Sequence, residues 1–316
     1  MNSSTFTLTA SDGVALFVHR WLPNAVPKAA VQIAHGLAEH AGRYARLADA
    51  LTGAGYAVYA ADHRGHGRTA PTREDLGFFA ERDGWGKCLD DLWRLNNRIA
   101  ADQPGLPIVL IGYSMGSFMA QQFISEHGEA LAGVVLSGSG GKPPARAAVV
   151  RMLARIERLR LGRRGKSALI RRLTFGAFNE HFEPARTPFD WLSRDQAEVD
   201  KYMADPLCGF PSSVQLVIDV LDAVADVTGA ARQARIPKRL PIHVIAGSRD
   251  PVSAENRTLL QLLAAYRAAG LERVTHRFYP EARHELVNEI NRDEVTHDLL
   301  ECLDQLIGGA SVCVTS

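Results

Sequence analysis

The 316-residue sequence has no long hydrophobic run, and its net charge is close to zero. No segment reaches the ~20 apolar residues of a transmembrane helix, and the N-terminus, Met1-Asn2-Ser3-Ser4-Thr5, has neither the basic nor the apolar region of a signal peptide. We therefore expect a cytoplasmic protein, at most peripheral to a membrane. With 36 Lys and Arg against 35 Asp and Glu, the overall charge of +1 gives no reason to expect nucleic-acid binding.

Cysteine is also scarce. The four cysteines, Cys88, Cys208, Cys302 and Cys313, show neither the paired spacing of a metal site nor that of a redox motif. We expect free thiols, buried or in the C-terminal tail, and a protein that works in a reducing compartment.

The most informative stretch is a short apolar run that ends in Gly-x-Ser-x-Gly. Residues 108–111 are apolar, Gly112-Tyr113-Ser114-Met115-Gly116 follows, and the next residues have helical spacing. This order predicts a strand, a sharp turn and a helix, with Ser114 at the apex in a strained conformation that small neighbours tolerate. A hydroxyl held above the end of a sheet, beside a helix N-terminus, is typical of a nucleophile.

The rest of the chain alternates short apolar strands with amphipathic helices, which predicts a mostly parallel eight-stranded sheet with helices on both faces. The expected strands are 29–34, 56–61, 108–112, 131–137, 242–246 and 274–279, with an antiparallel hairpin formed by 5–10 and 14–21. The main expected helices are 44–51, 85–101, 255–269 and 292–306.

This alternation stops after Ser137 for roughly 100 residues, which is too long for an ordinary crossover. The interrupted stretch is helical in pattern. We interpret residues 139–238 as an inserted helical cap (lid) over the carboxyl ends of the strands, where open α/β sheets bind ligands. Residues 1–138 and 239–316 would then form the core domain.

A serine hydroxyl becomes a good nucleophile when a histidine accepts its proton and a carboxylate orients that histidine. On a sheet of this kind the three residues are expected in the order serine, acid, histidine, with the acid and the histidine after strands. Asp250 follows the penultimate strand, and His284 follows the last one. We therefore predict Ser114, Asp250 and His284 as catalytic residues. Asp222 and Asp226 are weaker alternatives for the acid because they fall on expected cap helices.

The reaction also needs hydrogen-bond donors for the negative charge that develops on the substrate's carbonyl oxygen. One donor should be the backbone N–H of Met115, the residue after the nucleophile. The other should come from the loop after the first buried parallel strand, where we choose the N–H of Leu37. Because both contributions are made by the main chain, the two side chains matter little for this role.

Three motifs resemble the monoacylglycerol lipase and lysophospholipase group of α/β-hydrolases, which is of the serine aminopeptidase S33 type. The motifs are His35-Gly36-Leu37-Ala38-Glu39-His40-Ala41-Gly42-Arg43-Tyr44, Asp62-His63-Arg64-Gly65-His66-Gly67-Arg68-Thr69 and Gly112-Tyr113-Ser114-Met115-Gly116-Ser117. The cap stretch 179–195 is similar to bacterial lysophospholipase-like members. The resemblance covers nearly the whole chain and implies the α/β-hydrolase fold. The family often has a second serine after His-Gly-x, where this chain has Arg68-Thr69, and we expect no effect on the chemistry.

The resemblance implies a serine carboxylic-ester hydrolase that acts on a single-chain lipid ester, a monoacylglycerol or a lysophospholipid. The reaction would pass through an acyl-enzyme and use neither a metal nor an organic cofactor. A peptidase or an acyltransferase is an alternative, because relatives with similar caps include peptidases. A non-catalytic binding protein is a further alternative, which the ordered serine, acid and histidine disfavour because a binder does not need them.

The expected cap contains a strongly basic segment, although the net charge of the whole chain is close to zero. Residues 142–172 contain eleven Lys and Arg against Glu157 alone, interleaved with apolar residues at roughly helical spacing. A basic amphipathic helix can lie on an anionic membrane surface. The alternative is a solvated helix whose charges pair with later acidic residues of the cap, namely Glu180, Glu183, Asp190 and Asp195.

Overall fold

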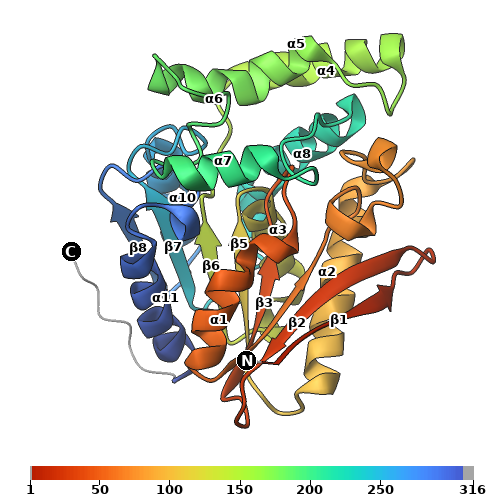
Figure 1. Cartoon of the computed structure of the whole chain (residues 1–316). Helices are drawn as coiled ribbons and strands as arrows, with labels where there is room; N and C mark the ends of the chain where they lie inside the picture. Colours follow the sequence, from red (N-terminus) through yellow and green to blue (C-terminus); the bar gives the residue numbers. More distant parts are fainter. Residues whose placement is uncertain (1, 309–316) are drawn as a thin grey trace.

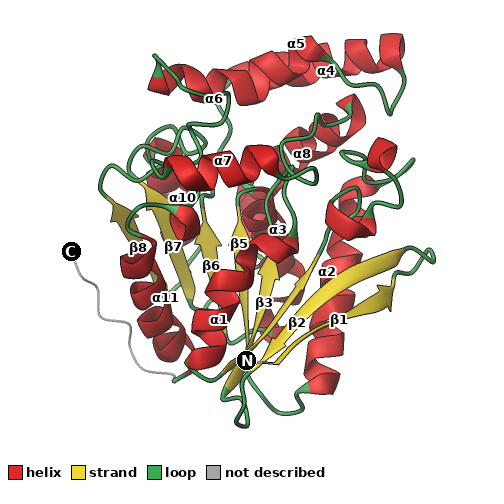
Figure 2. Cartoon of the chain, in the orientation of Figure 1, coloured by secondary structure: helices red, strands yellow, loops and turns green. Residues whose placement is uncertain are grey.

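The computed structural model describes residues 2–308 and contains one eight-stranded sheet (Figures 1 and 2). The strand order across the sheet is β1-β2-β4-β3-β5-β6-β7-β8. The strands are β1 (Asn2–Thr9), β2 (Ala15–Leu22), β3 (Ala29–Ala34), β4 (Tyr56–Ala61), β5 (Ile108–Tyr113), β6 (Gly133–Ser137), β7 (Ile242–Gly247) and β8 (Val274–Tyr279).

The sheet is parallel from β4 to β8 and antiparallel at its β1–β2 edge. The hairpin β1–β2 pairs Thr5 with His19, and β2 then pairs antiparallel with β4. The remaining neighbours all pair in parallel. Strands β3 and β5 are buried along their whole length because helices cover both faces, which explains their continuous apolar sequence. The predicted fold class is confirmed.

Helices form a layer on each face of the sheet. On one face lie α1 (Ala45–Gly53) and α11 (Arg292–Ile307), which bury Leu47, Leu51, Leu299 and Leu303. The other face carries α2 (Gly84–Asp102), α3 (Met115–His127) and α10 (Arg257–Ala268), which bury Leu95, Met119, Phe123 and Leu262. The apolar stripe of each helix therefore faces the sheet, as expected for amphipathic helices in this architecture.

Between β6 and β7 the chain is helical. The α-helices there are α4 (Arg146–Leu161), α5 (Ala168–Arg171), α6 (Ala177–Asn179), α7 (Gln196–Ala204), α8 (Val214–Val227) and α9 (Ala230–Gln233). Figure 1 shows α4 and α5 farthest from the sheet, with α7 and α8 nearer to the strand ends. Helix α8 buries Leu216, Ala223 and Val227 in the same apolar cluster as α2 and α3. The boundaries 139 and 238 of the cap stay predictions.

The basic residues of the segment 142–172 do not pair with the acidic residues that the solvated-helix alternative named. Arg151 and Arg155 of α4 contact Asp222 of α8, at 3.1 and 3.2 Å. Arg164 pairs with Asp75 and Glu81 of the core instead. The partners that this alternative named, Glu180, Glu183, Asp190 and Asp195, form no ion pair with residues 142–172 in the described structure, so this part of the alternative is wrong. The packing of α4 across α8 brings Asp222 closer than the later part of the cap.

Helix α10 begins at Arg257, two residues after the predicted start. The reason is a turn in which Ala254, Glu255 and Asn256 have φ values of 51°, 54° and 68°, outside the right-handed helical region. Ser253 stabilises this turn, because its Oγ accepts the N–H of Asn256 at 2.9 Å. The turn follows Asp250 directly and so belongs to the loop that positions this carboxylate.

Among residues 2–308, no helix is both long enough and apolar enough to span a membrane. Cys88, Cys208 and Cys302 are buried free thiols. Cys313 lies outside the described residues.

Candidate active site

Ser114 lies at the turn between β5 and α3 in a strained conformation, with φ 51° and ψ −117°. Its N–H donates to the carbonyl of Ser137 at 2.9 Å, and its own carbonyl accepts the N–H of Ser117 at 2.9 Å. Gly116 is essential to this turn, because a Cβ there would lie 2.1 Å from the carbonyl oxygen of Ala34. The hydrogen bonds and the close approach of helix and strand hold a conformation that serine alone would not adopt.

The structure brings the three predicted side chains together. His284 Nε2 lies 2.9 Å from Ser114 Oγ, and His284 Nδ1 lies 2.9 and 3.0 Å from the two carboxylate oxygens of Asp250. Asp250 and His284 are almost fully buried, at 0% and 1% exposed. The N–H of Val252 donates to Asp250 Oδ1 at 2.9 Å and fixes the carboxylate. This is the geometry that serine-histidine-acid catalysis requires.

The imidazole of His284 is held from two sides. The rings of Tyr113 and Trp191 each lie 5.0 Å from it, centroid to centroid. The backbone N–H of His284 donates to the carbonyl of Trp191 at 3.4 Å, and the N–H of Glu285 donates to the carbonyl of Leu192 at 2.7 Å. The segment between α6 and α7 therefore packs directly on the histidine loop and limits rotation of the ring.

The loop after β3 carries Leu37, the predicted oxyanion donor. Leu37 lines the cavity at Ser114. The preceding N–H, that of Gly36, already donates to Glu39 Oε1 at 2.6 Å. Ala38 has a φ of 58°, and its carbonyl accepts from the hydroxyl of Tyr202 at 2.8 Å and the N–H of Gly209 at 2.9 Å. Residues between β6 and β7 thus help to shape this loop, while the donor roles of Leu37 and Met115 stay predictions.

A buried ionic network, which the sequence did not predict, lies beside the site. Arg43 donates to Glu39 at 2.8 Å and to both carboxylate oxygens of Glu285, at 2.5 and 2.8 Å. Burial raises the pKa of Glu39. The network links the loop after β3 to the loop that carries His284. A signal was present, because Glu39 and Arg43 are four residues apart in one of the motifs, but nothing in the sequence places Glu285 beside them.

Two cavities that share lining residues lie at and beside Ser114. The small one, of about 20 Å³, is lined by Ser114 and His284 and also by Phe175 and Tyr202. The same two aromatic residues line a larger pocket of about 490 Å³ beneath the segment 168–176. Its walls are mainly apolar, formed by Ala168, Pro188, Phe189, Phe210 and Pro211, with Arg171 and Arg172 also lining it. The arrangement suits an apolar chain whose reactive end reaches Ser114.

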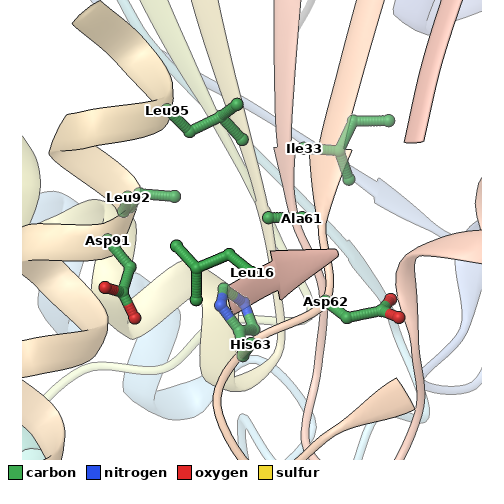
Figure 3. A pocket seen from close by; sticks show the side chains of 8 residues that line it. All are labelled: Leu16, Ile33, Ala61, Asp62, His63, Asp91, Leu92 and Leu95. Atoms are coloured by element: carbon green, nitrogen blue, oxygen red, sulfur yellow. The ribbon is translucent and has the colours of Figure 1, made fainter. Parts of the chain in front are cut away.

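A separate cavity, lined by residues of β2, β3, β4 and α2, is too small for a substrate. Its volume is about 10 Å³, close to that of a single water site. Figure 3 shows that His63, Asp91 and Leu16 line it, whereas the carboxylate of Asp62 points away. Asp62 instead accepts the N–H groups of Ala41 and Arg68, at 2.8 and 2.7 Å. It therefore connects the loops after β3 and β4.

Three histidines in these two loops form a buried cluster. The ring of His35 lies 4.1 Å from that of His63 and 5.4 Å from that of His66, between centroids. Burial lowers the pKa of His63 to about 3 and that of His66 to about 4, and it lowers the pKa of His35 as well. All three rings are therefore neutral in the folded protein at neutral pH.

We expect this cluster to make the protein less stable in acid. An unfolded histidine takes up a proton below pH ~6.5, whereas the buried ring stays neutral, so stability is lost as the pH falls, by about 1.4 kcal/mol per unit per group. Replacing His66 by Asn keeps a donor for the carbonyl of Arg64, which His66 Nδ1 contacts at 2.8 Å. Between pH 6.5 and 5, the free energy of unfolding of His66→Asn should fall by about 1.5–2 kcal/mol less than that of wild type.

Urea denaturation at both pH values measures this difference. Comparison with wild type is needed because burial raises the pKa of Asp219 to about 6, which acts in the opposite direction. The matched control is His297→Asn, since His297 is exposed and contacts only Glu301 among the ion-pairing acids. Equal pH dependence of His66→Asn and wild type would contradict the prediction.

The remaining acidic and metal-type candidates are accounted for by other contacts. Asp222 pairs with Arg151 and Arg155, as described above, and Asp226 pairs with Arg232 at 2.5 Å.

His40, Asp205 and Cys208 place donor atoms within 4.8 Å of one another. However, the N–H of Gly42 donates to His40 Nδ1, so His40 Nε2 carries the hydrogen and donates to Asp205 at 2.9 Å. Burial also raises the pKa of the Cys208 thiol, and a protonated thiol is a poor metal ligand.

Known proteins resemble this chain over nearly its whole length. Residues 25–291 match the family described as Serine aminopeptidase, S33. Human monoglyceride lipase is 31% identical over 294 residues, which cover 90% of this chain and 88% of the relative. The monoacylglycerol lipase of Mycolicibacterium smegmatis is 30% identical over 295 residues, which cover 91% and 92%.

A solved structure agrees. A thermostable carboxyl esterase from Bacillus coagulans, in complex with glycerol, has a TM-score of 0.89 at 26% identity and covers 97% of this chain and 99% of its own. These similarities confirm the resemblance and the fold class that the motifs predicted. The chain therefore belongs to the serine aminopeptidase S33 family of α/β-hydrolases.

Proposed function

We propose that this protein is a serine hydrolase that cleaves the carboxylic esters of single-chain lipids, monoacylglycerols or lysophospholipids. The observation that carries the proposal is the 2.9 Å contact between Ser114 Oγ and His284 Nε2, in a cavity that adjoins a mainly apolar pocket. The relatives named monoglyceride lipase and monoacylglycerol lipase support an ester with one acyl chain. The pocket would hold that chain.

In the proposed reaction, Ser114 Oγ attacks the ester carbonyl carbon while His284 Nε2 takes the hydroxyl proton. Asp250 accepts the Nδ1–H of His284, which keeps Nε2 free to act as a base and stabilises the imidazolium. The N–H groups of Leu37 and Met115 stabilise the oxyanion. As the bond to the alcohol breaks, the imidazolium protonates the leaving oxygen. Water then attacks the acyl-enzyme in the same way and releases the carboxylic acid.

One observation bears on the alternative that the protein is a peptidase. A site for a free α-amine needs an available carboxylate, and Glu39 and Glu285 line the small cavity. Their oxygens are already occupied, because Glu39 accepts from Gly36, Arg43 and Tyr44. Glu285 accepts from Arg43 and Asn288. The contacts therefore favour a neutral ester over a peptide N-terminus.

A substrate panel tests this proposal. The panel contains p-nitrophenyl esters of graded chain length, a monoacylglycerol, lysophosphatidylcholine and an aminoacyl-p-nitroanilide. We expect turnover of the esters, with a preference for chains long enough to fill the apolar pocket. Turnover of the anilide with no turnover of the esters would favour the peptidase. An absence of turnover together with no labelling by a fluorophosphonate would favour the non-catalytic binding protein.

We further propose that α4 contacts the membrane that supplies the substrate. Val149, Met152, Ile156 and Leu159 recur every three or four residues, and each is more than half exposed. They therefore form one apolar stripe on a helix far from the sheet (Figure 1). Arg146, Arg171 and Arg172 form no ion pair with any carboxylate in the described part of the chain. An apolar stripe beside unpaired cations fits an anionic lipid surface.

Vesicle co-sedimentation tests this contact. Binding should be stronger to vesicles containing phosphatidylglycerol than to pure phosphatidylcholine. Replacing both Arg171 and Arg172 by Gln should weaken anionic binding roughly 30-fold, since each cation contributes ~1 kcal/mol near such a surface. Ile156→Gln should also weaken binding, whereas Leu260→Gln should not, although both side chains are 54% exposed. Equal binding to neutral and anionic vesicles would contradict the electrostatic contribution.

A further inference from the structure

A groove with a basic lining lies beside the loop that carries Asp250. It has a volume of about 660 Å³ and shares no lining residue with the two cavities at Ser114. Its lining residues come from three segments that are far apart in the sequence, within 142–146, at His181 and within 251–261. We call it the basic groove. Its volume is in the range of sites that bind small molecules.

Cations outnumber carboxylates in the lining of the basic groove. Lys142, Arg146 and Arg257 line it, and Glu255 is the single carboxylate among its described lining residues. None of the three cations forms an ion pair with a carboxylate in the part of the chain that the structure describes. With His181 uncharged, the lining carries an excess of two positive charges, and this excess attracts an anion.

Two of these cations lie where a positive charge is unfavourable. Arg146 is the first residue of α4 and Arg257 is the first residue of α10, and neither helix has an acidic residue in its first turn. The helix dipole is positive at this end, so a cation there destabilises the helix. An anion in the basic groove would compensate this cost at both positions, which no carboxylate of the described chain does.

The backbone that carries these cations is fixed before any ligand binds. A Cβ at Gly141 would lie 2.2 Å from the carbonyl oxygen of Thr258, so the segment before α4 packs directly on the start of α10. In the turn before α10, the N–H of Glu255 donates to the carbonyl of Asp250 at 3.0 Å. The N–H of Thr258 donates to the carbonyl of Ser253 at 3.1 Å. A preformed wall of this kind lowers the entropy that is lost on binding.

The charge and the volume of the basic groove indicate the chemistry of its ligand. A phosphate monoester carries a charge of about −1.5 to −2 at pH 7, which matches the excess charge of the lining, and it offers three acceptor oxygens. A carboxylate carries only one negative charge. The groove is also larger than a phosphate group, and Pro143, Pro144 and Pro251 give it apolar surface for an organic portion.

We propose that the basic groove is a binding site for a phosphate monoester, whose phosphate contacts Lys142, Arg146 and Arg257 and whose organic portion lies against the prolines. This site is additional to the proposed active site, and it does not depend on the proposed function. The ligand would contact both the start of α4 and the start of α10, so it should tie the cap to the core and stabilise the folded chain. Two sources share this chemistry, a soluble monoester and the head group of phosphatidic acid.

Two binding measurements test the proposal and distinguish the sources. Calorimetric titration with glycerol 3-phosphate probes a soluble monoester, and glycerol is its uncharged control. Co-sedimentation with phosphatidylcholine vesicles that contain phosphatidic acid probes the head group, with phosphatidylglycerol, a phosphate diester, as the control lipid. Stronger binding of either monoester than of its control would support the site and identify the source. The absence of such a preference in both measurements would overturn the proposal.

Charge substitutions in the basic groove locate the site. Arg257→Gln and Lys142→Gln should each weaken binding of the monoester about fivefold, because each removes a cation near the phosphate. Glu255→Gln removes the carboxylate and should strengthen binding by a similar factor. Without ligand, the thermal midpoint of Arg257→Gln should be no lower than that of wild type, since the cation is unfavourable at the start of α10. A loss of binding in this variant then does not arise from unfolding.

The matched control is Arg267→Gln. Arg267 lies in the same helix, α10, and is exposed like Arg257, but it does not line the basic groove. This variant should keep the wild-type affinity within twofold. Equal weakening by Arg257→Gln and Arg267→Gln would show attraction by overall charge only and would overturn the proposal. Unchanged affinity in both Arg257→Gln and Lys142→Gln would overturn it as well.

Discussion

Replacing Ser114 with alanine is expected to lower kcat for ester hydrolysis by about 10⁴-fold or more, because the acyl-enzyme can no longer form. The expected magnitude follows from the contact of Ser114 Oγ with His284 Nε2 at 2.9 Å, which makes this hydroxyl the one that the imidazole can deprotonate. The fold should survive, since the hydrogen bonds of the turn are made by the backbone of Ser114. Steady-state kinetics with a p-nitrophenyl ester measures the loss.

Ser125→Ala is the matched control for this change. Ser125 lies in the same helix, α3, and its hydroxyl donates to the carbonyl of Gln122 at 2.7 Å, away from His284. This variant should keep at least half of the activity, and it should be labelled by a fluorophosphonate, as should wild type. Ser114→Ala should not be labelled. Retention of full esterase activity by Ser114→Ala would refute the assignment of the nucleophile.

Replacing Asp250 with asparagine is expected to lower kcat by about 10³–10⁴-fold, even though the side chain keeps its shape. The carboxylate can only accept from His284 Nδ1, which leaves Nε2 as the base. An asparagine NH₂ can donate to Nδ1 and so favour the tautomer that carries hydrogen on Nε2. That tautomer cannot accept the proton of Ser114. Because Asp250 and His284 are both buried, water cannot readily replace the lost acceptor.

Asp222→Asn provides the control for the acid. Asp222 is the alternative that the sequence left open, and the structure pairs it with Arg151 and Arg155 on α4. Its replacement should change kcat less than threefold. The thermal midpoint of each variant, followed by circular dichroism, separates a catalytic loss from unfolding. A larger loss of kcat in Asp222→Asn than in Asp250→Asn would reverse the assignment.

Local sequence patterns predicted many of the strands of this protein and the places of its candidate catalytic residues. The strand bounds of β3, β4 and β8 agree with the sequence prediction to the residue. For β3 and β4 the reason is a buried, mainly apolar run between polar or glycine-containing turns, which leaves few alternatives. The sequence also predicted the strand-turn-helix around Ser114 and the positions of Asp250 and His284 after β7 and β8. Each of these features depends on residues that are neighbours in the chain.

The tertiary structure decided what depends on residues far apart. The start of α10, the partners of the cap arginines and the network of Glu39, Arg43 and Glu285 all follow from how separate segments pack. The same holds for Trp191, because nothing in the sequence predicts that its ring packs against His284. Sequence periodicity reports which face of an element is apolar. It carries no information on which distant side chain meets that face, because packing of the whole chain selects the partner.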